Sequence, residues 1–188
     1  ADFDGSRPTV ADIRRSHIVF ALLMVSIGIP MLHAGQDFLH SKGGVNNTYQ
    51  RGDLNALSFR RRAEYAVSSE YVSAWVAFRQ SELGQLLRHY SRASVGFFKC
   101  RKASGRNALA VLYNADNSLG PSQLLFAVNP EFEELVLPLG DWKGAWQFRG
   151  VLLTQKYPGG FYCMFRRSSN PFWDDPIIHA PPNSGVQY

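Results

Sequence analysis

The hydrophobic period of this 188-residue sequence changes near residue 92, and that change limits the fold more than any other feature. Before it, apolar residues recur at the three- and four-residue spacing of amphipathic helices. After it, they alternate with polar residues, as in half-buried strands. Helices followed by a run of strands are typical of an α+β fold. The sequence therefore predicts a helical region followed by an all-β region.

The helical region contains two predicted helices separated by a strand and a long loop. Thr9 is a suitable N-cap for a helix over Val10–Val25, and a second apolar stripe predicts a helix over Ser68–Arg88. Between them, Ile27–Ala34 is a short apolar run, which predicts a strand buried on both faces as in a parallel sheet. Gly35–Arg62 is a polar loop of unusual length, and such loops commonly carry function.

The region beyond residue 92 is predicted to form an antiparallel β-sandwich of about seven short strands. Turn-forming residues such as Asp116-Asn117-Ser118 and Asn129-Pro130 separate the strands. The proline-rich tail after Ser168 is expected to be extended. The predicted strands are Val95–Cys100, Ala108–Tyr113, Gln123–Val128, Phe132–Leu137, Ala145–Phe148, Val151–Leu153 and Phe161–Phe165.

The strand and loop together resemble a known enzyme family. The residues that carry the resemblance are Gly28–Phe38, then Ser41–Gly44, Asn46–Tyr49 and Asp53–Leu57, in that order. This order is similar to the eighth barrel strand and following loop of pullulanase and isoamylase-type enzymes, the α-glucan-debranching members of the α-amylase superfamily. Trp75–Arg79 is similar to part of the last barrel helix of that family. Asp37 and Thr48 stand where the family more often has Glu and Ser.

The resemblance implies a domain organisation. Residues 1–90 are expected to be the end of a (β/α)₈ barrel, consisting of a helix, the last strand, a long loop and the last helix. Residues 91–170 are expected to form the β-sandwich and residues 171–188 an extended tail. The length of 188 residues excludes a complete barrel of about 250 residues. Because a strand cut from a barrel leaves apolar faces uncovered, residues 12–88 are expected to pack on the sandwich or on a second copy of the chain.

The resemblance also implies that the reactive groups lie elsewhere. A retaining glycoside hydrolase needs two carboxyl groups about 5–5.5 Å apart. In this family they follow the fourth and fifth barrel strands, with a further Asp after the seventh. Asp2 and Asp4 lack the preceding His of that last motif and are interpreted as solvated acids. The chain is therefore expected to have no catalytic residue and not to hydrolyse glucan alone.

The candidate substrate-binding residues belong to the strand end and the loop, where a barrel of this kind faces its substrate. Some of them have an alternative structural role: Asp37 as a backbone-holding turn residue, and the Asn and Asp side chains as turn formers. Lys42 and Tyr49 add a cation and a stacking ring. The candidates are Gln36, Asp37, Lys42, Asn47, Tyr49, Asp53 and Asn55.

Partner and cofactor expectations follow from charge and residue spacing. A net charge of +5 is ordinary for a soluble domain, and Arg60–Arg62, beside Glu64, is interpreted as a solvated or ion-paired segment rather than a nucleic-acid patch. No metal, cofactor, nucleic-acid or membrane partner is expected. Cys100 and Cys163 are expected to be buried thiols. The expected partners are α-glucan polysaccharide, the remainder of the barrel and, in one alternative, a second copy of the chain. A cytoplasmic location is favoured because the acidic N-terminus lacks a signal peptide.

Two functional alternatives to debranching remain open at this point. Trp142 and Trp146 are candidates for the stacking platform of a non-catalytic polysaccharide-binding module, or for sandwich scaffold if buried. The second alternative is an α-1,4-acting amylase or glucanotransferase of the same superfamily. His33, on the apolar strand, is interpreted as a packed core histidine.

Overall fold

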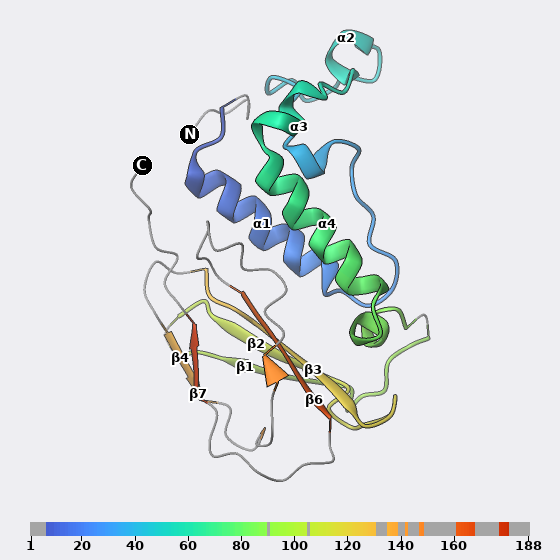
Figure 1. Cartoon of the computed structure of the whole chain (residues 1–188), viewed down its shortest axis with the longest axis vertical. Coiled ribbons are helices and arrows are strands. Elements are labelled where there is room, and N and C mark those ends of the chain that lie inside the picture. Colours follow the sequence, from blue (N-terminus) through green and yellow to red (C-terminus); the bar gives the residue numbers. More distant parts are fainter. Residues whose placement is uncertain are drawn as a thin grey trace.

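The computed structural model describes residues 7–89, 91–104, 106–130, 135–138, 142, 147–148, 161–167 and 177–180. Helices α1 (Val10–Met24) and α4 (Ala66–Gln80) lie side by side against one face of a β-sheet, and the loop that joins them folds at their far end (Figure 1). The loop contains a 3₁₀ turn, η1 (Gln36–Phe38), and the short helices α2 (Gly52–Asn55) and α3 (Arg60–Glu64). Helices and antiparallel sheets occupy separate regions, so the predicted α+β class is confirmed.

Helix α1 begins where the sequence predicts. The hydroxyl of Thr9 accepts a hydrogen bond from the Asp12 backbone N–H at 3.2 Å, and the Asp12 carboxylate accepts one from the Thr9 N–H at 3.0 Å. This reciprocal capping box satisfies two amides that a helix start leaves unpaired. The Thr9 hydroxyl also donates to the Asp12 carboxylate at 2.6 Å, and this bond and the one from the Thr9 N–H lower the pKa of Asp12, because both favour the ionised carboxylate.

The second predicted helix, over Ser68–Arg88, is wrong at its C-terminal end. Helix α4 ends at Gln80, Ser81 adopts an extended backbone, and a separate 3₁₀ helix, η2 (Leu83–Leu87), follows. The chain turns so tightly that a Cβ on Gly84 would collide with the carbonyl oxygen of Phe78. Only glycine permits this approach, and the apolar spacing alone does not reveal it.

Ile27–Ala34 does not form the predicted buried strand. Within the described residues it pairs with no other strand, and Ile29 and Met31 are 77% and 86% exposed. Its start is held by one backbone hydrogen bond, from Gly28 N–H to the Leu87 carbonyl at 3.1 Å. The prediction fails because a strand needs neighbouring strands to pair with, and the apolar pattern of one segment does not show whether they are present.

Buried Arg79 fixes the end of α1 and the beginning of this extended segment. One of its terminal nitrogens donates to the carbonyls of Met24 at 2.5 Å and Ser26 at 2.8 Å. The other donates to the carbonyls of Gly28 at 2.5 Å and Leu87 at 3.1 Å. A single guanidinium from α4 thus satisfies carbonyls in three separate segments.

The main sheet has five antiparallel strands in the order β1-β2-β3-β6-β5. A second antiparallel pair joins β4 to β7, and β7 falls in the predicted extended tail. Where the predicted strands fall on described residues they coincide with strands to within three residues at each end. The first residues of the predicted strands Phe132–Leu137 and Ala145–Phe148, and the whole of Val151–Leu153, lie outside the described residues. The bounds are β1 Phe98–Lys102, β2 Leu109–Tyr113, β3 Ser122–Val128, β4 Leu135–Pro138, β5 Gln147–Phe148, β6 Phe161–Arg167 and β7 Ile177–Ala180.

Strand β3 is buried on both faces. Leu124, Phe126 and Val128 belong to a cluster shared with the helices, where the ring of fully buried Trp75 meets Phe126 edge-on at 6.3 Å. Leu125 and Ala127 belong to a second cluster on the opposite face. The expectation that the helical region packs on the β region is therefore confirmed.

The prediction of two buried thiols is wrong for Cys100. It lies on the edge strand β1, which is largely exposed along its length, and its side chain is exposed and free. An edge strand has one open side, so its residues are buried less than those of a central strand with the same apolar pattern. The side chain of Cys163 lies outside the described residues.

Candidate functional site

The candidate site begins with the tight turn at Gly35. Gly35 has φ of 86°, and a Cβ there would lie 2.7 Å from the Cβ of His40, so glycine is required. After it, the Gln36 side-chain oxygen accepts a hydrogen bond from the His33 N–H at 3.3 Å. The backbone carbonyl of Asp37 accepts one from the Ser69 hydroxyl of α4 at 3.2 Å. Gln36 and Asp37 are both half-buried at the point where the extended segment meets α4.

Buried Thr48 organises the middle of the loop. Its hydroxyl accepts a hydrogen bond from the Lys42 ammonium at 3.2 Å and donates to the Asn55 side-chain oxygen at 2.8 Å. The Asn55 amide nitrogen donates back to the Thr48 carbonyl at 2.5 Å. Asn55 is therefore engaged in holding the loop, and Lys42 retains two ammonium hydrogens for other acceptors.

Three of the predicted site residues point to solvent from this framework. Asn47 is exposed, and the ring of Tyr49 is 79% exposed. Asp53 is exposed and accepts two hydrogen bonds from Arg51, at 2.9 and 2.6 Å. The Arg51 guanidinium lowers the pKa of Asp53, so this carboxylate is ionised across the neutral range.

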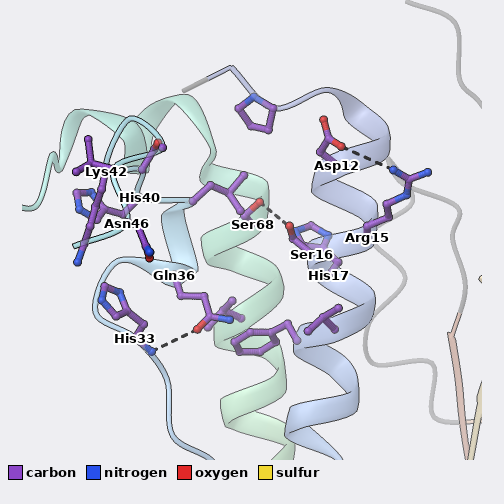
Figure 2. Close-up of a pocket in the computed structure, with 18 residues that line it drawn as sticks. Asp12, Arg15, Ser16, His17, His33, Gln36, His40, Lys42, Asn46 and Ser68 are labelled. Carbon is purple, nitrogen blue, oxygen red and sulfur yellow. Dashed lines mark hydrogen bonds and ion pairs between the residues drawn. The ribbon is translucent and has the colours of Figure 1, made fainter. Parts of the chain in front are cut away.

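A cavity of about 810 Å³ opens between α1, the loop and the start of α4. Two of the seven predicted site residues, Gln36 and Lys42, are among the described residues that line this cavity. Figure 2 shows Lys42, His40 and Asn46 grouped on the loop side of the cavity, with Asp12 and Arg15 on α1 at the other side. The structure therefore separates the predicted residues into a cavity group and an exposed loop group.

Three histidines of the cavity lining were not predicted as site residues. His17, on the inner face of α1, stacks on the Tyr71 ring at 4.2 Å, and its Nε2 lies 3.0 Å from the Ser68 hydroxyl. Burial lowers the pKa of His17 to about 4, so its imidazole is neutral at physiological pH. The sequence offered one sign of His17, its place in the apolar stripe of the first helix. That place indicates a buried side chain but does not indicate a cavity beside it.

His33 and His40 lie on the loop side of the cavity. His33 is exposed, so its interpretation as a packed core histidine is wrong; the segment that carries it has no covering strand among the described residues. Both ring nitrogens of His40 are covered and have no hydrogen-bond partner within the described part of the chain. Burial and the neighbouring charges of His33, Lys42 and Arg61 lower the pKa of His40.

The other candidate surfaces have structural roles. Trp142 is buried in the second cluster and lies under the Arg101 guanidinium, 4.8 Å from the ring centre; Trp146 lies outside the described residues. Arg60 pairs with Glu64 at 3.2 Å, and Arg61 donates to the Leu39 carbonyl at 2.9 Å. Among the described residues, no three His, Cys, Asp or Glu side chains come together to hold a metal ion. Nor does any helix in that part of the chain have the length and apolarity needed to cross a membrane.

The chain is thus an α+β unit in which two helices on an antiparallel sheet support a long, polar, hydrogen-bonded loop. No family model matches the sequence. Among curated proteins, it is 28% identical over 182 residues to the glycogen debranching enzyme of Cronobacter sakazakii, an alignment that covers 87% of this chain and 27% of that enzyme. It is 31% identical over 75 residues to the pullulanase of Bacillus subtilis, covering 39% of this chain and 10% of that enzyme.

Solved structures give the same result for the fold. Pullulanase type I from Bacillus subtilis, complexed with maltose, matches with a TM-score of 0.70 at 16% identity, over 95% of this chain and 23% of that one. Pullulanase from Anoxybacillus, complexed with maltotetraose, matches with a TM-score of 0.67 at 19% identity, over 85% and 24%. This chain spans about a quarter or less of these relatives. It therefore resembles a portion of a pullulanase/isoamylase-type debranching enzyme, and the resemblance predicted from the loop is confirmed.

Proposed function

We propose that this chain is the C-terminal portion of an α-glucan-debranching glycoside hydrolase, which in its complete form cleaves α-1,6 bonds of glycogen, starch or pullulan. The observation that carries the proposal is the 182-residue similarity to a glycogen debranching enzyme, which runs through both the helical and the β regions. In this proposal, residues 1–90 complete a catalytic barrel, residues 91–170 form a sandwich that stabilises it, and residues 171–188 are a tail. The carboxylates that cleave the bond belong to the remainder of the barrel.

The exposed extended segment supports this arrangement. Ile29 and Met31 present apolar side chains to solvent, and within the described residues Ile27–Ala34 pairs with no strand, its backbone hydrogen bonds being at Gly28 and His33. Apolar groups and unpaired backbone on one segment are typical of a strand separated from its neighbours. We propose that this segment pairs with strands of the remaining barrel when they are present.

The loop is proposed to contact the glucan in the complete enzyme. Tyr49 offers an exposed ring for stacking on a sugar face, and Asn47 and Asp53 of the same loop offer hydrogen-bonding groups for hydroxyls. Gln36 and Lys42 face the cavity, whereas Asp37 and Asn55 are proposed to act mainly by holding the loop through the contacts described above.

Trp142 disfavours the alternative of a stand-alone polysaccharide-binding module, because a stacking platform must be exposed and this ring is buried. The α-1,4-acting alternative shares the same fold and needs a functional test. The test uses the longest natural polypeptide that contains this sequence and the 188-residue chain by itself.

The long polypeptide is expected to release reducing ends from pullulan and to debranch glycogen, with little action on unbranched amylose. The short chain is expected to release none from any of them. Preferential cleavage of amylose would replace the proposal with the α-1,4 alternative, and turnover of any glucan by the short chain would contradict it.

A further inference from the structure

The cavity between α1 and the loop has a cationic end and a neutral polar end. The loop side carries Lys42, His33 and His40, with the Arg61 guanidinium close enough to act on His40. The α1 side carries Asp12 and Arg15, which lie 4.0 Å apart as an ion pair, and the hydroxyl of Ser16. Asp12 is the only carboxylate among the described lining residues, and it is also engaged by Thr9. The loop side therefore has an excess of positive charge, carried by Lys42 with the Arg61 guanidinium nearby.

His40 has an unmet hydrogen-bonding need at the cationic end. Neither ring nitrogen has a partner in the described part of the chain, although the ring lines the cavity. A buried polar group without a partner is energetically unfavourable. A ligand oxygen that reached the ring nitrogens would satisfy this need. Lys42 donates one hydrogen to Thr48 and has two left for the same ligand.

We infer that this cavity binds a phosphorylated sugar, with the phosphoryl group at Lys42 and His40 and the sugar hydroxyls toward Gln36, Ser16 and the Asp12–Arg15 pair. Phosphoryl oxygens are strong acceptors that pair with Lys and His donors. A cavity of about 810 Å³ exceeds the needs of a free phosphate and lies in the range of ordinary small-molecule sites. The α1 end of the cavity offers both hydrogen-bond donors and hydrogen-bond acceptors, which sugar hydroxyls need because each hydroxyl can donate and accept. The inference concerns the 188-residue chain and does not depend on the proposed debranching activity.

Calorimetric titration of the chain with glucose 6-phosphate, inorganic phosphate and maltose tests this inference. Glucose 6-phosphate is expected to bind saturably at one site, inorganic phosphate more weakly at the same site, and maltose not at all. Lys42→Met is expected to weaken glucose 6-phosphate binding at least about tenfold, the usual effect of losing one charge-assisted hydrogen bond. Lys102→Met, which removes the same charge from exposed β1, serves as the matched control and is expected to leave binding unchanged.

His40→Leu separates binding from folding. Because the imidazole has no partner in the described part of the free chain, its replacement is expected to keep or raise the thermal midpoint of unfolding while weakening glucose 6-phosphate binding about tenfold. The inference is overturned if glucose 6-phosphate does not bind, or if Lys42→Met binds it as tightly as the unmodified chain. It is also overturned if maltose or inorganic phosphate binds as tightly as glucose 6-phosphate.

Discussion

The helix–sheet core and the loop are stabilised by different physical means. The core depends on burial: Trp75, Phe126 and Leu124 are almost wholly removed from water. The loop depends on hydrogen bonds: Thr48, Lys42 and Asn55 bond to one another while Tyr49 and Asn47 remain exposed. Substitutions in the core should therefore alter stability, and substitutions at the loop surface should alter recognition.

Trp75→Ala is expected to have the largest effect on stability. The ring is fully buried between α4 and β3, and its removal should lower the free energy of unfolding by about 3–5 kcal/mol, measured by urea denaturation. Val76→Ala, one position away on the half-exposed face, is the control and should cost less than about 1 kcal/mol. Equal losses from both substitutions would show that the helix–sheet contact is not the core.

Arg79→Met is expected to rank second. It keeps much of the apolar stem but leaves carbonyls of Met24, Ser26 and Gly28 without their donor, at a cost of about 2–4 kcal/mol by urea denaturation. Arg88→Met removes an exposed guanidinium with one contact, to the Ser81 carbonyl, and should cost under about 1 kcal/mol. A loss from Arg79→Met no greater than that from Arg88→Met would show that Arg79 does not hold the end of α1 to the extended segment.

His17 makes the stability of the core depend on pH. Its pKa is lowered by burial from 6.5 to about 4, so the folded chain holds the neutral ring while the unfolded chain binds a proton below pH 6.5. Its stabilising contribution is therefore present above pH 6.5 and is lost as the pH falls toward 4, by at most about 3 kcal/mol.

The measurement is the urea midpoint between pH 7 and pH 4 for the unmodified chain and for His17→Asn, which cannot titrate. The unmodified chain should lose stability more steeply over this interval. Parallel pH profiles would show that His17 is not the group responsible.

Thr48→Val is expected to have a smaller effect on global stability than the three core substitutions. It breaks the bonds to Lys42 and Asn55 and should lower the free energy of unfolding by about 1 kcal/mol. The loss should be mainly local, and it is measured as faster amide hydrogen exchange in residues 48–55. Thr48→Ser keeps the hydroxyl and should retain most of the protection. If Thr48→Val leaves exchange in this segment unchanged, the hydroxyl does not organise the loop.

The difference between the core and the loop also explains which features the sequence predicts well. Helix α1 and strand β3 were predicted correctly, because a capping box and apolar periodicity act between residues close in the chain. The strand at Ile27–Ala34 and the straight helix to Arg88 were wrong, because pairing partners and the close approach at Gly84 depend on distant residues. The family resemblance placed seven candidates on the loop, yet the side-chain periodicity contained no sign of the cavity histidines, which meet only after the loop folds back on α1.

The central claim, that the core is scaffold and the exposed loop serves glucan recognition, is tested most directly with Tyr49→Ala in the longest natural polypeptide containing this sequence. The measurement is kcat/KM on pullulan together with the thermal midpoint of unfolding. The account predicts a loss of about tenfold or more in kcat/KM, on the scale of one lost stacking contact, with an unchanged midpoint. Unchanged turnover, or a loss of turnover that follows a lowered midpoint, would contradict it.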